Sequence, residues 1–320
     1  MKPNILAFTR ENSGVPFHRV ESPLKEMQSR GLIDVTFINE ILEVTPEMWQ
    51  NVTHIIASRT FPVVPLSHFK HLCNKEGVKL IIDEDDWWSL PYTHPLYRTY
   101  DERKLSQKIQ ASILVADEVW TTNHHLAKKI KKLNKNVVIV PNALNEKDAQ
   151  WQNTRLESET IRFGYIGGQH HQEDLKMAQI DLTGYDGYAA DVDGYPELIN
   201  AKKLETKKPQ EYGMLYQHFD VSLAPLVPSE FAKCKSHLKM IEAGMSGCAL
   251  IVSDVSPYSP YITKENCLAI PHKGDWMKAI KQLNENPNQV HDLKEGLKEW
   301  AKDFRMEKIN DIRWNALTNS

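Results

Sequence analysis

Short apolar runs alternate with polar, helix-type stretches along the first half of the chain. Continuous apolar runs are typical of strands buried on both faces, and their alternation with helices is typical of a parallel sheet. The pattern therefore predicts one Rossmann-like α/β domain over residues 1–150. The predicted strands are 5–8, 35–38, 54–57, 79–83, 118–121 and 137–140, and the predicted helices include 22–29, 66–75 and 102–116.

The second half repeats this alternation after a polar stretch, 145–160, which we interpret as a linker. It predicts a second α/β domain over residues 151–304, followed by a terminal segment, 305–320. Residues 181–208 are rich in Gly, Asp and Tyr and receive no assignment. The predicted strands are 161–168, 221–226, 249–252 and 266–270, and the predicted helices are 209–218, 236–245, 275–283, 289–304 and 306–317.

Composition narrows the class of protein. The 320 residues are 41% hydrophobic and 25% charged, with a formal net charge of −3, as expected of a soluble globular protein without a global basic field. No run of about 18 apolar residues and no signal-peptide pattern occur, so we expect neither a membrane anchor nor export. The four cysteines are far apart, without C-x-x-C spacing, which favours reduced thiols in a cytoplasmic protein.

Candidate chemistry lies at the junction of a loop and a helix near residue 236. Lys235 and Ser236 stand where free backbone N–H groups open the predicted helix, and such an end attracts phosphate. Glu242 lies almost two turns further on, where its carboxylate could accept hydrogen bonds from the two hydroxyls of a ribose. The junction therefore predicts a nucleotide diphosphate site. The alternative is an ordinary solvated helix that happens to carry a lysine and a glutamate.

Four consecutive acids stand at the end of the predicted strand 79–83 and directly after it. They are Asp83, Glu84, Asp85 and Asp86. One interpretation is a solvated strand end. A second is a metal site, since Asp83-x-Asp85 resembles the D-x-D of GT-A glycosyltransferases. A third is that Asp85 or Asp86 orients an acceptor hydroxyl. The aromatic residues that come next either line an acceptor groove by stacking or are ordinary core residues. They are Trp87, Trp88, Tyr92 and Tyr97.

Two further stretches carry candidate charges. The loop 11–19 follows the first strand and contains Gly14, His18 and Arg19. The planar fork of Arg19 suits a phosphate, although both charged residues could be plain surface. The loop lacks G-x-G-x-x-G, which disfavours an NAD-type oxidoreductase. The helix-type stretch 124–135 has one apolar face and one lysine face, which is either solvated surface or a contact for the phosphates of a polyanion.

The segment 219–258 resembles the nucleotide-sugar site of family 4 glycosyltransferases. The pattern K-S-x-x-K-x-x-E, formed by Lys235, Ser236, Lys239 and Glu242, is similar to the small phage-type branch of that family. Only the second glutamate of the family's E-x7-E motif matches, because Cys234 stands at the first. The G-G-x-x-H-x-x-D-L pattern from Gly167 is also similar. The resemblance implies the α/β GT-B fold, with two Rossmann-like domains facing across a cleft and a C-terminal helix over 305–320 that crosses back onto the first domain.

The resemblance also implies roles for these residues. Glu242 would bind the donor ribose, and the backbone amides of Ser236 and His237 would bind the diphosphate. Lys235 would stabilise the negative charge that builds on the leaving diphosphate. The catalytic set expected is Arg19, Lys235, Asp85 and His18. Further donor contacts are expected from Gly14, Gly167, Gly168 and His171, and acceptor contacts from Asp86, Trp87 and Trp88. The reaction implied is retaining transfer of a hexose or pentose from a nucleotide-sugar donor, with UDP expected, and without a metal or another cofactor.

The resemblance to the phage-type branch, which includes enzymes that glycosylate 5-hydroxymethylpyrimidines in DNA, implies 5-hydroxymethylcytosine in double-stranded DNA as the acceptor. The lysine stretch and the aromatics are compatible with an extruded base. A surface glycan or lipid-linked saccharide is the alternative acceptor. A non-catalytic nucleotide- or DNA-binding module on the same fold is the alternative function. The expected location is the cytoplasm, which is that of the host cell if a bacteriophage encodes the protein.

Overall fold

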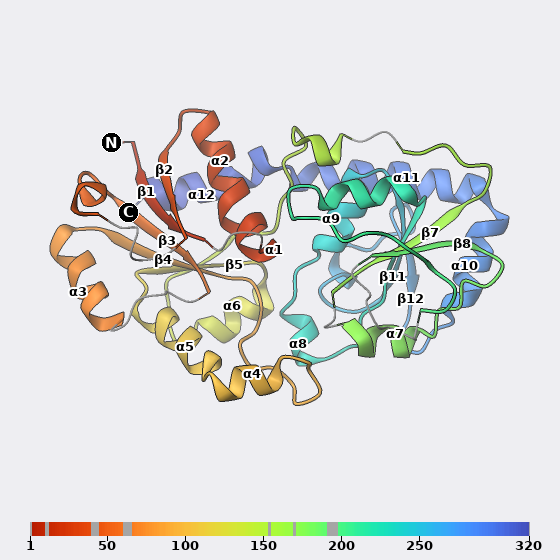
Figure 1. The fold of residues 1–320 in the computed structure, drawn as a ribbon, viewed down its shortest axis with the longest axis horizontal. Coiled ribbons are helices and arrows are strands. Elements are labelled where there is room, and N and C mark those ends of the chain that lie inside the picture. The colour runs from red at the N-terminus through yellow and green to blue at the C-terminus, as the bar shows by residue number, and fades with distance from the viewer. Residues whose placement is uncertain are drawn as a thin grey trace. The chain divides into compact units, whose positions relative to one another are not determined.

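The computed structural model describes residues 2–9, 13–39, 45–59, 66–152, 155–168, 171–190 and 198–319. They form two compact units, which Figure 1 shows as two groups of strands and helices. The first unit contains Met1–Asn145, Cys234–Ser236 and Met306–Ser320, and the second contains Glu146–Lys233 and His237–Arg305. The first change of unit therefore falls after Asn145 rather than at the predicted 150–151.

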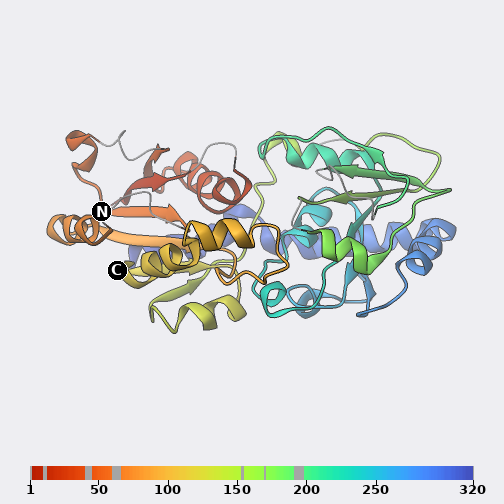
Figure 2. The same ribbon diagram turned by 60° about the horizontal axis from the view of Figure 1, so that its bottom comes forward.

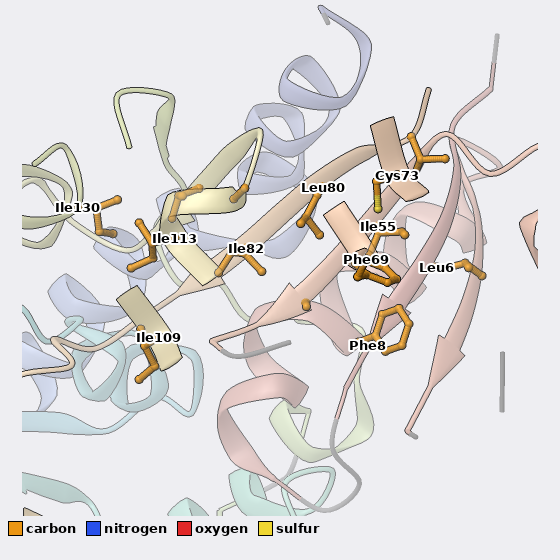
Figure 3. Close-up of a cluster of buried hydrophobic side chains, with 14 of the residues drawn as sticks. Leu6, Phe8, Ile55, Phe69, Cys73, Leu80, Ile82, Ile109, Ile113 and Ile130 are labelled. Carbon is orange, nitrogen blue, oxygen red and sulfur yellow. The ribbon is translucent and has the colours of Figure 1, made fainter. Parts of the chain in front are cut away.

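The first unit is built on a parallel six-stranded sheet of order β2-β1-β3-β4-β5-β6. Every strand predicted in this half is confirmed to within a residue or two. The central strands β1, β3 and β4 are apolar runs that the sheet buries on both faces, whereas the edge strands β2 and β6 are only partly buried. Side chains from these strands and from the helices over them form one hydrophobic core (Figure 3). The strands are β1 Asn4–Phe8, β2 Asp34–Ile38, β3 His54–Ser58, β4 Lys79–Glu84, β5 Glu118–Thr121 and β6 Val137–Ile139.

Helices cover both faces of this sheet, with α2 and α12 on one face and α5 and α6 on the other (Figures 1 and 2). This arrangement follows from right-handed crossovers, since the chain moves in opposite directions from β1 to β2 and from β3 to β6. The helices are α2 Ser22–Ser29, α3 Leu66–Glu76, α4 Tyr97–Glu102, α5 Leu105–Val115, α6 His124–Ile130 and α12 Met306–Thr318, with a 3₁₀ turn, η3, at Pro46–Trp49.

Two local predictions for this unit were wrong. The loop expected over 11–19 is helical from Gly14 onward, because α1 Gly14–Pro16 and the π-helix η1 Phe17–Glu21 lead directly into α2. Residues 11 and 12 of that loop lie outside the described residues. The single helix expected over 102–116 is interrupted between α4 and α5, where Lys104 has a left-handed φ of 52°.

The last helix, α12, belongs to the first unit and packs on α2. Asn310 Nδ2 donates to the carbonyl of Pro23 at 3.0 Å and to Glu26 Oε2 at 2.6 Å. Arg313 is fully buried beneath this contact and donates to Asn310 Oδ1 at 2.9 Å. Burial, together with the nearby Arg19, lowers the pKa of Arg313 to about 9. Polar side chains thus join α12 to the rest of the unit.

The second unit also has a parallel six-stranded sheet, of order β12-β11-β10-β7-β8-β9. The strands predicted near 161, 221, 249 and 266 are confirmed, although β7 ends at Ile166 and not at Gly168, and β10 ends at Ala224 and not at Leu226. Strands β8 and β9 lie in the stretch that received no assignment, part of which, 191–197, is outside the described residues. The strands are β7 Arg162–Ile166, β8 Asp186–Ala190, β9 Lys202–Lys203, β10 Val221–Ala224, β11 Ala249–Ser253 and β12 Leu268–Ile270.

The helices of the second unit confirm most of the predicted pattern. The prediction for 209–218 was wrong in type, because Tyr212–His218 is a 3₁₀ helix, η6. The helix expected from Ser236 begins at Leu238, and a one-turn helix, α8, lies in the loop before it. The helices are α7 Gln172–Ala178, α8 Glu230–Lys233, α9 Leu238–Met245, α10 Trp276–Glu285 and α11 Pro287–Ala301, with 3₁₀ turns η4 Ala149–Trp151, η7 Ser259–Tyr261 and η8 Lys302–Phe304.

The sequence predicted no membrane anchor and reduced cysteines, and the described residues bear on both points. Among the helices of the described ranges, none has both the length and the apolar character that a bilayer crossing requires. The four cysteines are all buried and free, so no disulfide links the elements.

Candidate functional site

The segment 234–236 is held at the carboxyl edge of the first unit's sheet. Asn123 comes just after β5, and its Nδ2 donates to the carbonyls of Cys234 at 3.0 Å and Lys235 at 2.8 Å. Asn142 comes after β6, and its Nδ2 donates to Ser236 Oγ at 2.7 Å. The side chain of Cys234 lies in the hydrophobic core of the same unit. Hydrogen bonds from two asparagine side chains therefore hold the predicted donor-binding segment against the first unit's sheet.

Arg19 supports this segment from the interior. Its Nε and Nη2 donate to the two oxygens of Asp83 at 2.9 and 2.7 Å. Its Nη1 donates to the carbonyl of Val140 at 2.7 Å and to Asn142 Oδ1 at 3.0 Å. Only 1% of Arg19 is exposed, and the preceding His18 is buried as well. The direct contact expected between Arg19 and a phosphate is thus corrected: the guanidinium holds Asn142, which in turn holds Ser236.

A second arginine, Arg59, organises the acids after β4. It donates from Nε to Asp85 Oδ1 at 2.9 Å, from Nη2 to Asp86 Oδ2 at 3.2 Å, and from Nη1 to the Tyr100 hydroxyl at 3.1 Å. Lys235 Nζ lies 3.8 Å from Asp86 Oδ2, which places the predicted catalytic lysine beside this cluster. The four acids are therefore not a plain solvated strand end, because cations of the same unit bind them.

The sequence analysis missed Arg59, although a signal for it exists. Arg59 follows β3 directly, and Ser58 pairs in register with Asp83 of β4. Residues just after neighbouring parallel strands meet at the same edge of the sheet, so an arginine after β3 faces the acids after β4.

Asp83 and Glu84 are the buried members of the acidic cluster, and the two carboxylate oxygens of Glu84 have no hydrogen-bond partner among the described residues. Burial raises the pKa of Glu84 well above its usual range; the charge of Arg59 opposes this, and Asp85 and Asp86 add to the rise. Burial also raises the pKa of Asp85, against the attraction of Arg59. Glu84 and Asp85 therefore bind a proton more tightly than isolated carboxyl groups do.

The interpretation of Asp83-x-Asp85 as a metal site has little support from these contacts. Asp83 accepts on both carboxylate oxygens from the Nε and Nη2 groups of Arg19, and Asp85 is bound by Arg59. Within the described residues, no group of three or more His, Cys, Asp or Glu side chains is arranged to hold a metal ion. The two aspartates are ion-paired to separate arginines instead.

The predicted acceptor aromatics have different environments. Trp88 is only 8% exposed and packs in the hydrophobic core, so its expected stacking on an acceptor is corrected to a packing role. Trp87 is partly buried, and Lys129 Nζ lies 4.3 Å from the centroid of its ring. Tyr92 and Tyr97 are exposed, at 83% and 39%. Trp87 therefore stays a candidate for acceptor contact, because it follows the acidic cluster directly in sequence and its ring is not fully buried.

In the second unit, two glycines follow β7 where a nucleotide was expected. A Cβ on Gly167 would lie 2.2 Å from the Tyr165 hydroxyl oxygen, so only glycine fits there without a shift. Gly168 follows it, and the next two residues, 169 and 170, lie outside the described residues. Gly14 of the first unit differs, because a Cβ there would meet nothing within 4 Å.

His171 begins the approach to α7 and contacts its first turn. His171 Nδ1 lies 2.6 Å from Asp174 Oδ2, and Asp174 Oδ1 accepts from the backbone N–H of Val227 at 2.6 Å. About a quarter of the His171 side chain is exposed. This pair ties the turn after β7 to the loop after β10, which is the arrangement expected at the carboxyl edge of the second sheet.

Glu242 lies on α9 and is 2% exposed. Its Oε2 accepts from the Tyr216 hydroxyl at 2.8 Å and from Lys239 Nζ at 2.9 Å. Lys239 also donates to the Tyr212 hydroxyl at 2.8 Å. The glutamate predicted to read the ribose is therefore not a solvated surface residue, because side chains from η6 and α9 surround its carboxylate.

His237 stands just before α9, and its ring is only 1% exposed. The ring packs against Tyr261 and Phe304 with centroids 4.1 and 4.6 Å apart, and against Trp300 at 5.8 Å. Burial lowers the pKa of His237 to about 3, so the ring is neutral at pH 7. The imidazole cannot add positive charge near a diphosphate, and the role predicted for this residue rests on its backbone N–H alone.

Comparisons with known proteins bear on the fold. No protein-family model matches the sequence, and no curated protein matches it in sequence. Among solved structures, a glycosyltransferase from Rickettsia africae ESF-5 superposes with a TM-score of 0.63 over 100% of both chains at 11% identity. HepE from Anabaena, in complex with UDP and glucose, gives a TM-score of 0.63 over 99% of this chain and 100% of HepE at 12% identity.

A sucrose-phosphate synthase from Thermosynechococcus elongatus is also similar, with a TM-score of 0.60 over 99% of this chain and 100% of the synthase at 15% identity. These similarities, together with two parallel six-stranded sheets and their helices, show the α/β GT-B fold. The predicted fold class is confirmed. At these identities the likeness establishes the fold and not the reaction, which must be argued from the site.

Proposed function

We propose that the protein is a glycosyltransferase that takes a sugar from a nucleotide diphosphate donor. The observation that carries this proposal is the sequence Lys235–Glu242: Asn123 and Asn142 hold its first part rigidly, and it leads directly into α9, where Glu242 is held by its neighbours. Preorganised donors at a helix start suit a diphosphate. One solved structure with the same fold, HepE, holds UDP and glucose, which supports UDP as the nucleotide.

In the proposed reaction, the bond between the anomeric carbon of the sugar and the diphosphate oxygen breaks. A bond forms between that carbon and the acceptor oxygen, the acceptor hydroxyl loses its proton, and the diphosphate leaves as an anion. The role of the protein is to stabilise the charge that builds on the diphosphate. We assign this role to Lys235 and to the backbone N–H groups of Ser236 and His237, with Arg19 as a positioning residue. Retention of configuration and independence from metals are part of the proposal.

For the acceptor, we propose 5-hydroxymethylcytosine in DNA. The exposed lysines of and after α6 suit a phosphate backbone, and Asp85 or Asp86 would orient the hydroxyl. The second candidate is the hydroxyl of a glycan or a lipid-linked saccharide. The presence of two carboxylates, Asp85 and Asp86, next to Trp87 in the sequence favours this candidate, since sugars bind through hydrogen bonds and stacking. The proposed location is the cytoplasm.

The test incubates the protein with UDP-sugars and either hydroxymethylated duplex DNA or a saccharide panel, and measures UDP release and product mass. Glu242→Ala is the site variant, and Lys281→Ala, on the exposed face of α10, is the matched control. We expect UDP release and a gain in nucleoside mass, both lost in the site variant only. A mass gain on saccharides alone would refute the DNA acceptor. Nucleotide binding without release on any acceptor would identify a non-catalytic module.

A further inference from the structure

An open pocket of about 710 Å³ lies within the second unit, at the amino edge of its sheet. It is lined by the segment 155–159, by Arg162 and by Asp220. Arg162 is the first residue of β7 and Asp220 directly precedes β10, so both lie where these parallel strands begin. The turn after β7, where donor contacts are expected, lies at the opposite edge, about 15 Å away for strands of this length. The pocket is therefore separate from that turn.

Three cationic side chains converge on the single carboxylate of Asp220. Its Oδ1 accepts from Arg155 Nη1 and from Lys294 Nζ, both at 3.0 Å. Its Oδ2 accepts from Arg162 Nε at 3.0 Å and from the backbone N–H of Arg162 at 3.1 Å. Burial raises the pKa of Asp220, but the hydrogen bonds from Arg162 and the charge of Lys294 outweigh it and hold that pKa well below its usual range. Asp220 is thus ionised at neutral pH, and its one negative charge leaves two of the three positive charges uncompensated.

The guanidinium of Arg162 has two donor groups to spare. Only 4% of the residue is exposed, and its hydrogen bonds to Asp220 use Nε and the backbone N–H. Its Nη1 and Nη2 have no hydrogen-bond partner among the described residues, although the residue lines the pocket. Arg155 differs, because its Nη1 and Nη2 already donate to the carbonyls of Phe219 and Gly247 at 2.9 and 2.6 Å. Since buried donors without a partner cost free energy, Arg162 favours a ligand that accepts from both groups.

The charges around Arg162 also favour an anion. The pKa of His218 is lowered, first by burial and then by the charges of Arg162 and Lys207, which indicates a positive field at this edge of the sheet. Two acids that line the pocket, Glu157 and Glu159, oppose that field, but both are exposed. Water screens an exposed charge much more strongly than a buried one, so the guanidinium of Arg162 dominates the field beside it.

We propose that this pocket binds a phosphate-bearing small molecule, with Nη1 and Nη2 of Arg162 donating to two oxygens of the phosphate. Two uncompensated positive charges match a phosphate dianion, and the planar fork of a guanidinium matches two phosphate oxygens. The volume of about 710 Å³ lies in the range of pockets that hold small molecules, so a phosphate ester fits as well as inorganic phosphate. The inference goes beyond the proposed function, because this pocket is a second ligand site.

The test titrates inorganic phosphate and glycerol 3-phosphate into the protein by calorimetry, in a phosphate-free buffer with UDP at a saturating concentration. UDP fills the proposed donor site, so the titration detects binding elsewhere. We expect a Kd below about 1 mM for at least one probe, and tighter binding of glycerol 3-phosphate would identify an ester as the ligand. A Kd above about 1 mM for both probes would overturn the inference. If UDP does not bind, the proposed function fails, whereas phosphate binding still supports the inference.

Two variants locate the bound phosphate. Arg162→Lys keeps a positive charge beside Asp220 but removes the fork, so we expect the Kd to rise at least about fivefold, while Arg98→Lys, exposed on α4, is the matched control. Glu159→Gln removes an acid from the pocket and should tighten binding about threefold, whereas Glu285→Gln makes the same change of charge on α10 and should have no effect. An unchanged Kd in folded Arg162→Lys would overturn the inference. If that variant does not fold, Glu159→Gln decides it.

Discussion

Arg19 and Asp83 form a buried ion pair in the first unit, and we expect Asp83→Ala to destabilise that unit strongly. The two hydrogen bonds, at 2.9 and 2.7 Å, join side chains that are 1% and 0% exposed. Removing one partner of such a pair costs about 3–5 kcal/mol, because the other charge stays buried without compensation. The nearby Arg313 is also fully buried, and its Nε and Nη2 have no hydrogen-bond partner among the described residues. The loss of Asp83 would leave both guanidinium groups without this carboxylate, which favours the upper end of that range.

The assay is urea unfolding of three variants, followed by circular dichroism. Asp83→Ala should lose about 3–5 kcal/mol of unfolding free energy, whereas the double variant Arg19→Met with Asp83→Leu should lose less, since apolar residues can replace a buried pair. Asp34→Ala is the control: its pair with Lys2 is solvent-exposed, and it should lose less than about 1 kcal/mol. A loss below about 1 kcal/mol in Asp83→Ala would refute the positioning role of Arg19 and reopen its contact with a phosphate.

Three further predictions follow from single residues. Gly167→Ala should cost about 1–3 kcal/mol of unfolding free energy, because its Cβ meets the Tyr165 hydroxyl, while Gly14→Ala, which meets nothing within 4 Å, serves as the control in the same thermal melts. His237 has a pKa of about 3 when folded against an ordinary value of 6.5, so the unfolded chain takes up the proton first. Stability should therefore fall as the pH drops from about 6.5 toward 3, by up to about 1.4 kcal/mol per pH unit, and His237→Phe should flatten that slope in urea titrations at several pH values. The four buried cysteines, two of which have pKa values raised by burial to about 11 and 12, should react with a thiol reagent only after unfolding; rapid labelling of the native protein would contradict this.

Sequence patterns predicted the sheets well because each central strand is an apolar run with one possible place in a parallel α/β layer. Strand β8 was missed because Asp186–Ala190 contains a glycine and polar residues and lacks such a run. The helical start at Gly14 was missed because its Gly and Pro residues are typical of loops, although Pro is compatible with the first turn of a helix. Local composition is a poor guide where tertiary packing decides the conformation.

The sequence predicted which segment forms the candidate site, but not the hydrogen bonds and ion pairs that hold it. The pattern of Lys235, Ser236 and Glu242 marked the segment, because helix starts and carboxylates have recognisable chemistry. The partners Asn123 and Asn142 were not predicted, since each is a single asparagine about a hundred positions away in sequence. The interior location of Arg19 depends likewise on Asp83, which only the strand register brings beside it.

The central claim is that Glu242 and the helix start before it bind the donor nucleotide. Its most direct test is calorimetric titration of UDP into the wild type, Glu242→Ala and the control Glu285→Ala, whose glutamate is exposed on α10. We predict that Glu242→Ala raises the Kd for UDP at least about tenfold, equivalent to about 1.4 kcal/mol, and that the control leaves it unchanged. An unchanged Kd in folded Glu242→Ala would contradict the account.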